Sequence, residues 1–393
     1  MKNAGSAERQ TAVPPWRDVR VLRVAGQLAV VLAVAILLGF LVRNLTVAMA
    51  QRGLSFEFAF LEQTAGFEIG ESPIPYRATD TYAQAFLVGL LNTLFISILG
   101  ILLATILGVV VGVARLSPNW LLSRVAAGYV ELIRNTPLLV QLFIIFFAVL
   151  SQLPAVRDSI ALPGSIFLNQ RGLFVPGPQL AATFAPWLAL VAAGMAGAVA
   201  TWAFARRREA ESRPSHHLRT IGLLALGVIA VVGWIVLAPV RFDVPVLGRF
   251  NFTGGLALSS SFTALLVGLV IYTAAFIGEV VRGGIQSVRR GQLEAARALG
   301  LSEGEILRLV IFPQALRVVV PPLTSQYLNL TKNSSLAIAV GYPDVFKIGV
   351  TMANQTGQPV PVIALVMGTY LTISLVTSLL MNLYNRRVQV LER

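Results

Sequence analysis

The chain has 393 residues, of which 56% are hydrophobic and 12% are charged, and its formal net charge is +13. Soluble domains carry about 25% charged residues, so the composition excludes an ordinary soluble domain and predicts an all-α polytopic membrane protein. The absence of cysteine excludes disulfides, thiolate metal sites and thiol nucleophiles.

Eight apolar runs are long enough to cross a bilayer, because a hydrocarbon core of roughly 30 Å needs about 20 apolar residues per helix. We expect membrane helices near residues 24–45, 84–114, 137–153, 180–205, 219–240, 262–281, 317–341 and 361–384. Within the second, Gly100, Ala104, Gly108 and Gly112 share one helical face, which predicts close packing on another helix.

The first run has two interpretations. A basic segment precedes it and Ala48-Met49-Ala50 resembles a cleavage site, as in a signal peptide. However, a signal-peptide core is usually about 7 to 15 residues long, and the run from Val24 to Val42 is longer. We therefore favour an uncleaved helix.

Lysine and arginine fall mainly on one side of the predicted helices. If the N-terminus is cytoplasmic, 22 of the 31 basic residues lie in the inner segments 2–23, 115–134, 206–219, 282–317 and 386–393. Cytoplasmic segments of membrane proteins are enriched in these residues. We thus expect both termini in the cytoplasm, with 46–82 and 154–179 as outer loops that can carry short surface helices. The positive charge then needs no nucleic-acid partner, and lipid covers the outward helix faces.

The inner segment 283–317 contains more structure than a simple connection needs. It begins as an amphipathic helical stretch, which Gly300 can end with a positive φ. Ser302 and Glu305 have the spacing of a capping box, which predicts a second helix from about Ser302. We expect that helix to stop near Pro313. The segment is therefore predicted to form a rigid helix-turn-helix.

This segment resembles the EAA loop of ABC importer permeases. The matching residues are Glu294, Ala295, Ala296, Gly300, Val310 and Pro313. Val310 and Phe312 replace the isoleucine and leucine of the family pattern. The resemblance implies that the loop inserts a coupling helix into a separate ATPase subunit. The alternative is an ordinary basic connection between two spans.

Other segments resemble the polar amino acid permeases within that family. They are YVELIRNTPLLVQLFIIFF (129–147), FIGEVVRGGI (276–285) and NLTKNSSLA (329–337), and 60–94 resembles the general L-amino acid permease branch. Thr136 as N-cap and Pro137 at the first helical position would start a helix in the first of these. The resemblance implies a type I (MetI-like) importer core with extra helices.

The same resemblance divides the chain into four parts. Residues 1–83 hold the tail, the first helix and an outer loop, and 84–153 begin the permease core. Residues 154–260 are an insertion with two extra helices, and 261–393 complete the core with the coupling loop 283–317.

The chain is not expected to be an enzyme or to bind a cofactor. A P-loop needs a Gly-Lys pair, and none of its three lysines follows a glycine. The resemblance implies that ATP and Mg²⁺ bind to separate ATPase subunits in the bacterial inner membrane complex. It also implies a periplasmic amino-acid-binding protein and a second homologous permease chain, as a heterodimer.

Polar residues follow helical spacing in the seventh predicted span. Gln326, Asn329, Lys332 and Asn333 are candidates for a substrate pathway, because polar groups inside a bilayer usually face a cavity or a bundle interior. Lys332 can attract a substrate carboxylate, or it can pair with a neighbouring carboxylate or reach a polar cavity. Glu279 and Arg282 are three residues apart, which predicts a structural pair rather than a proton site.

The main alternative function is an ion-coupled secondary transporter or a channel. A proton-coupled carrier usually has carboxylates at mid-membrane, whereas Glu279 lies near an interface. The third possibility, a membrane enzyme, is not supported, because the sequence contains no recognisable catalytic constellation. His216 and His217 lie in a polar linker, so no metal site is predicted.

Overall fold

The computed structural model describes residues 19–51, 56–210 and 216–389. Within them, seven helices are long and apolar enough to cross a membrane, and the bent pair α3 and α4 gives an eighth span if counted as one. In chain order the spans are α1 (Val19–Gln51), α2 (Tyr82–Ala114), α3 (Trp120–Asn135) with α4 (Leu138–Phe143), α5 (Phe184–Ala210), α6 (His216–Leu237), α7 (Ser260–Gln286), α10 (Phe312–Asn333) and α12 (Pro359–Gln389). The prediction of about eight membrane helices is confirmed.

Shorter helical segments connect these spans. The α-helical ones are α8 (Arg290–Ala298), α9 (Glu303–Ile306) and α11 (Val345–Thr356). The 3₁₀ segments are η1 (Ala59–Glu62), η3 (Leu150–Gln152), η4 (Val156–Asp158) and η6 (Ser334–Ala339), and the π-helical ones are η2 (Ile144–Val149) and η5 (Leu307–Ile311).

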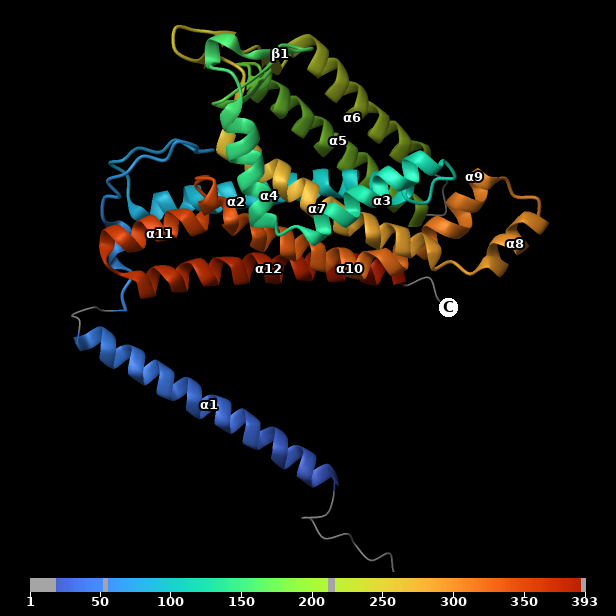
Figure 1. Cartoon of the computed structure of the whole chain (residues 1–393). Helices are drawn as coiled ribbons and strands as arrows, with labels where there is room; N and C mark the ends of the chain where they lie inside the picture. The colour runs from blue at the N-terminus through green and yellow to red at the C-terminus, as the bar shows by residue number, and fades with distance from the viewer. Residues whose placement is uncertain (1–18, 52–55, 211–215, 390–393) are drawn as a thin grey trace, which may run out of the picture.

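The helices α2, α7, α10 and α12 run side by side and form the core bundle (Figure 1). Gly108 and Gly112 of α2 face α7, and a Cβ atom at Gly108 would lie only 2.6 Å from the Ile277 side chain. At Gly112 it would lie 2.8 Å from the carbonyl oxygen of Gly278. Because these contacts leave no room for a side chain, the predicted small-residue face is a packing surface.

The third span, predicted at 137–153, is preceded by the helix α3, which the sequence placed in an inner segment, and the two helices α3 and α4 are bent by 105°. The prediction of Thr136 as N-cap is wrong, because Pro137 occupies that position and Thr136 Oγ1 donates to the Leu132 carbonyl at 2.9 Å. Pro137 is itself extended, with a ψ of 137°, so α4 begins one residue later than predicted and Thr136 ends α3. Gln141 Nε2 donates to the carbonyls of Ile133 and Thr136, both at 2.9 Å, and so satisfies the end of α3.

The helix that starts after Ser302 does not stop near Pro313, contrary to the prediction. It continues through η5 into α10, where Pro313 lies in the first turn. As the second residue of α10, Pro313 lies where an N–H has no partner within α10 itself. The π-helical turn of η5 already interrupts the regular bonding pattern at this point.

Residues 160–259 contain short antiparallel strands on both sides of α5 and α6. They are β1 (Ile160–Leu162), β2 (Ile166–Asn169), β3 (Gly172–Val175), β4 (Gly177–Leu180), β5 (Val240–Asp243), β6 (Val246–Leu247), β7 (Phe252–Thr253) and β8 (Leu256–Ser259). One sheet has the order β1-β2-β3-β8, and β4-β5 and β6-β7 form two ribbons. The reading of 154–179 as a loop with at most short helices is therefore incomplete: η4 is such a helix, but the strands were not predicted.

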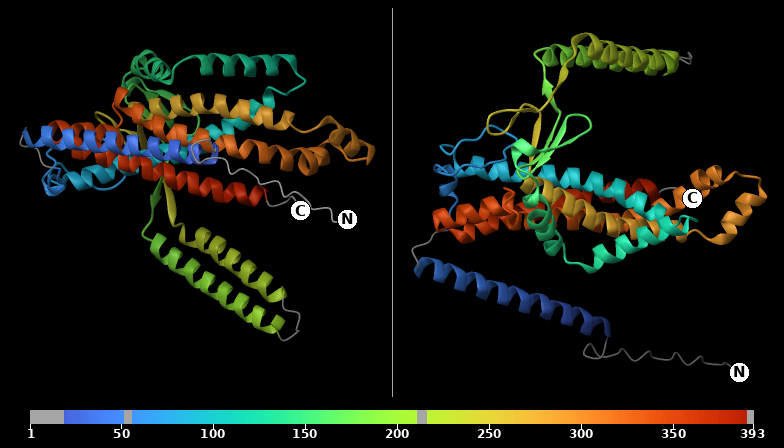
Figure 2. Two further views of the ribbon diagram at one scale, coloured as in Figure 1. Left: turned by 90° about the horizontal axis from the view of Figure 1, so that it is seen from below. Right: turned by 45° about the horizontal axis from the view of Figure 1, so that its top comes forward.

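The helices α5 and α6 form a hairpin that projects away from the bundle (Figure 2). Trp187 Nε1 donates to the Ala230 carbonyl at 3.2 Å and joins the two helices. The ribbon β4-β5 connects them to the core, with Leu180 paired to Val240. On another side, α1 lies apart from the other helices, and its described side chains are exposed.

The two ends of the bundle carry different segments (Figures 1 and 2). One end holds the α2–α3 connection, α8, α9 and the last turns of α12. The opposite end holds 56–81, the strands and α11. There Phe60 and Tyr82 pack with Ile348, Met352 and neighbouring residues of α11 and α12 in one buried cluster.

Candidate functional site

The loop between α7 and α10 turns sharply at Gly300, whose φ is 78°. The Gly300 N–H donates to the Arg297 carbonyl at 2.9 Å, and the Leu301 N–H donates to the Ala296 carbonyl at 3.2 Å. These two bonds form a Schellman motif, which requires a left-handed residue after the helix end. Gly300 therefore ends α8 in the conformation expected from the sequence.

The next helix begins with the predicted capping box. Ser302 Oγ accepts from the Glu305 N–H at 3.4 Å, and the Glu305 carboxylate accepts from the Ser302 N–H at 2.9 Å. Arg297 Nε donates to Glu303 Oε1 at 3.0 Å across the turn. This hydrogen bond to Glu303 raises the pKa of the exposed Arg297 guanidinium above its ordinary value. Local bonds alone thus fix the angle between α8 and α9.

The six residues of the EAA-like pattern separate into two groups. Three are exposed on the loop: Glu294, Ala295 and Gly300. The others turn inward or lie partly buried at the base of the loop: Ala296, Val310 and Pro313. The first group can contact another protein, and the second positions the loop on the bundle.

Leu299 was missed as a candidate contact residue. It lies next to Gly300 at the tip of the loop, and 81% of its surface is exposed. A signal was available, because Leu299 follows Ala295 by four residues and such residues share a helical face. The exposed Ala295–Leu299 face offers apolar surface on the loop.

The predicted polar stripe lies on α10, and its residues are not equally accessible. Asn329 and Lys332 are exposed, whereas Gln326 and Asn333 are partly buried. The adjacent Leu330 packs on Gly100, near the middle of α2. Within the part of the chain that the structure describes, the Lys332 side chain has no hydrogen bond or ion pair, so it faces outward from a single chain.

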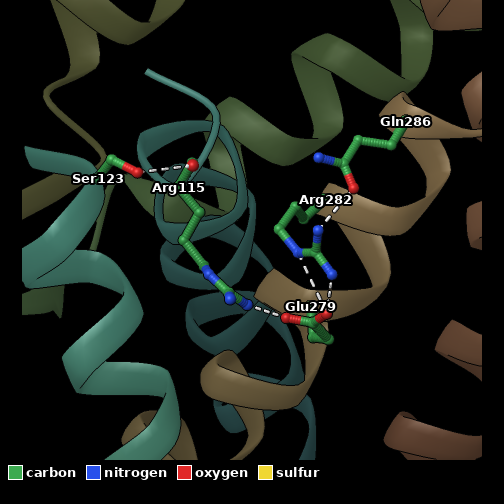
Figure 3. Close-up of polar contacts among 5 residues, drawn as sticks. All are labelled: Arg115, Ser123, Glu279, Arg282 and Gln286. Carbon is green, nitrogen blue, oxygen red and sulfur yellow. Dashed lines mark hydrogen bonds and ion pairs between the residues drawn. The ribbon is translucent and has the colours of Figure 1, made fainter. Parts of the chain in front are cut away.

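The Glu279 carboxylate of α7 lies at the coupling-loop end of the bundle and joins α7 to the end of α2 (Figure 3). It accepts from Arg115, which follows α2, and from Arg282, whose Nε lies 3.1 Å from Oε1. Arg282 also donates to Gln286 at 2.5 Å, and Ser123 of α3 donates to the Arg115 carbonyl at 3.0 Å. Sequence spacing indicated the Glu279–Arg282 contact but not Arg115, which is distant in the chain.

A second polar network lies at the opposite end and was not predicted. Asp344 is fully buried, caps α11 through the Lys347 N–H at 2.8 Å, and accepts from Tyr370 Oη at 2.9 Å. Burial raises the pKa of the Asp344 carboxyl from 3.8 to about 6. Asn92 Nδ2 donates to the Pro343 carbonyl at 2.9 Å, which attaches this network to α2.

Among residues 19–51, 56–210 and 216–389, no group of three His, Asp or Glu side chains is arranged to hold a metal ion. The geometry described above supports contact with a partner at the coupling-loop end and polar recognition elsewhere. It does not resemble a hydrolytic centre.

Comparison with known families gives one match that covers most of the chain. The family model described as "Binding-protein-dependent transport system inner membrane component" matches residues 100–390. The matched range includes the second half of α2, the helices α7, α10 and α12, the β strands, the hairpin and the loop at Gly300.

Individual proteins are similar over nearly the full length. YhdX of Escherichia coli (strain K12) is 45% identical over 369 residues, covering 93% of this chain and 94% of that protein. The general L-amino acid transport system permease protein AapQ of Rhizobium johnstonii is 45% identical, covering 92% of each chain. The glutamate/glutamine/aspartate/asparagine transport system permease protein BztB of Rhodobacter capsulatus is 40% identical, covering 96% of each.

Proposed function

The chain belongs to the family of binding-protein-dependent transport system inner membrane components, and we propose that it is the permease subunit of an ATP-driven amino acid importer. It is a multi-pass membrane permease, and in this family ATP hydrolysis is carried out by separate subunits. The observation that carries the proposal is the rigid, exposed turn at Gly300, together with full-length similarity to amino acid permeases.

The coupling loop suits contact with an ATPase. Its exposed face combines the Glu294 carboxylate with the apolar surface of Ala295 and Leu299. The backbone bonds at the end of α8 and the side-chain capping box of α9 hold this face in one orientation, so a displacement of the loop passes into η5 and α10. We infer that ATP and Mg²⁺ bind on that partner and that this chain holds no cofactor.

Permeases of this family work with ATPase subunits and a binding protein. We further propose that a second, homologous permease chain completes the transporter as a heterodimer. Asn329 and Lys332 support this, because they are exposed on α10 near mid-bundle, where contact with lipid is costly. A second permease chain and a water-filled pathway would cover them.

We propose that both termini lie in the cytoplasm of a bacterium, in its inner membrane. The basic α2–α3 connection and the last turns of α12 lie at the same end as the coupling loop (Figure 2). The terminal residues themselves, including Arg393, lie outside the described part of the chain. A cytoplasm-active reporter fused after Arg393 should be active, and a periplasmic location would reject this orientation.

The pathway role of Lys332 can be tested by Lys332→Met. If Lys332 attracts the substrate carboxylate, the KM for uptake should rise roughly tenfold, because charged hydrogen bonds contribute about 1.5–3 kcal/mol. Complex assembly and ATP hydrolysis without substrate should stay close to wild type. Unchanged transport kinetics would mean that Lys332 has a structural role and does not attract the substrate carboxylate.

The proposed function is tested by purifying this chain with its ATPase and permease partners and measuring ATP hydrolysis stimulated by the amino-acid-loaded binding protein. Glu294→Lys reverses the charge on the exposed loop, which lies outside the spans. It should leave membrane insertion normal and reduce ATPase association or stimulated hydrolysis severalfold. Glu57→Lys, at an exposed position at the opposite end, is the matched control. Wild-type transport by Glu294→Lys would contradict the coupling role.

A further inference from the structure

A cavity of about 480 Å³ lies at the end of the bundle opposite the coupling loop. Its walls come from three distant parts of the chain: 67–71, Ser259 at the start of α7, and 341–351 with α11. Glu71 and Lys347 both line it, together with the hydroxyls of Ser259 and Thr351. The cavity is separate from the polar stripe of α10.

Fixed backbone elements hold the two opposite charges in place. The Glu71 carboxylate accepts from Ser259 Oγ, and Ser259 is itself the N-cap of α7. The Glu71 carbonyl accepts from Asn92 Nδ2 at 2.9 Å, which ties this segment to α2. Lys347 lies on α11 and donates to the Gly341 carbonyl. These contacts position both groups before any ligand arrives.

The two charges line one cavity without forming an ion pair with each other, since each is bonded to a neutral group. Burial raises the pKa of the Glu71 carboxyl and lowers the pKa of the Lys347 ammonium, and it outweighs the attraction between the two groups and the attraction of Asp344 for Lys347. Both shifts mean that the charged forms are incompletely compensated by their surroundings. A ligand with one positive and one negative group would supply the missing compensation to both.

We propose that this cavity binds the zwitterionic head of an α-amino acid, with the ammonium on Glu71 and the carboxylate on Lys347. The inference rests on the proposed function and adds a recognition site at the outer end, before the pathway along α10. The volume lies within the roughly 300–1,000 Å³ of small-ligand sites. Phe67, Ile69 and Ile348 give the cavity an apolar wall for the ligand side chain.

The experiment uses the complete transporter in proteoliposomes, with L-glutamine as the probe. Glu71→Gln and Lys347→Gln should each raise the KM for uptake roughly tenfold or more, because each removes a charged hydrogen bond to the ligand. Glu71→Asp and Lys347→Arg should restore part of the loss. The matched controls are Glu62→Gln and Arg77→Gln, which change exposed charges of the same segment outside the cavity.

Competition by ligand analogues separates recognition from a structural role. Wild-type uptake should be inhibited weakly by deaminated glutamine, which lacks the ammonium, and by decarboxylated glutamine, which lacks the carboxylate. Glu71→Gln should lose discrimination against the deaminated analogue, and Lys347→Gln should lose it against the decarboxylated one. Loss of stability alone would not remove discrimination against a different analogue in each variant.

Three results would overturn the inference. Unchanged KM and discrimination in both variants, with active wild type, would leave the cavity without a role in recognition while the proposed function stands. Normal amino acid binding with lost stimulation by the binding protein would assign the cavity to that protein. A wild-type complex that transports none of the amino acids tested would instead reject the proposed function, and the inference with it.

Discussion

The two ends of the bundle are held together in different ways. At the coupling loop, the ion pair that bridges α8 and α9 joins residues only six positions apart, Arg297 and Glu303, and it is exposed. At the opposite end, Asn92 bonds to a carbonyl 251 positions away, at Pro343, and Asp344 is fully buried. The loop is therefore a local structure that a partner can contact, whereas the other end is fixed by long-range contacts within the chain.

This difference predicts different consequences of substitution. Changes in the loop should alter communication with the ATPase and leave the bundle intact, because few other contacts depend on the loop. Changes in the Asp344 network should destabilise the fold, because that network joins α2, α11 and α12. The following predictions test this separation.

Asp344→Ala should have the largest effect on stability. At pH 5 it should lower the free energy of unfolding by about 2 to 4 kcal/mol, because it removes the N-cap of α11 and the buried acceptor of the Tyr370 hydroxyl. Thermal unfolding in detergent measures the loss. Asp344→Asn is the control, since asparagine also caps helices. Equal loss in both variants would mean that the cap and the Tyr370 bond are not what stabilises this end.

The same carboxyl should make stability depend on pH. Its pKa is about 6 in the folded protein and 3.8 as the ordinary value, so the folded state holds the proton more tightly. The stabilisation that this carboxyl contributes to the folded state is then fully present below about pH 4 and is lost as pH rises to about 6. The expected loss is about 3 kcal/mol, since the two pKa values differ by about 2.2 units and one unit is about 1.4 kcal/mol. Unfolding midpoints between pH 4 and 8 should show this slope in wild type and lack it in Asp344→Asn.

Gly300→Val should have the smallest effect on stability and a large effect on transport. A β-branched residue at φ 78° is strained by about 1 to 2 kcal/mol, and that strain stays in an exposed turn. The unfolding midpoint of the bundle should hardly change, while copurification of the ATPase falls. Gly300→Asn should be tolerated better, because asparagine adopts positive φ more readily. A lower unfolding midpoint for the Gly300→Val variant would show that the loop also stabilises the bundle, contrary to the prediction.

The same contrast explains what the sequence could predict. Gly300, Ser302 and Glu305 act on neighbouring residues, so their roles in helix ends were correctly predicted. Thr136 was assigned wrongly because Pro137 is extended rather than helical, which moves the start of α4 one residue further along the chain. Helix spans follow from composition and were therefore predictable.

The missed features depend on residues far apart in the chain. Strand β3 has four residues and pairs with β8, more than 80 positions later, so neither shows a recognisable local pattern. Arg115 meets Glu279 across 164 positions, and Ser259 meets Glu71 across 188. The helix α11 is an exception: it was missed although local signals mark it, since Asp344 and Gly357 stand at its two ends.

The connection of the α5–α6 hairpin has a consequence for how this chain can vary in length. The hairpin leaves the β4-β5 ribbon after Leu180 and returns at Val240, and these residues are paired. The Ala181 N–H also donates to the Pro239 carbonyl at 3.0 Å, so the two ends of the hairpin lie side by side. A chain that joined β4 to β5 by a short turn would keep the same strand register. The two helices are thus a detachable module, and the number of spans can change without moving the core.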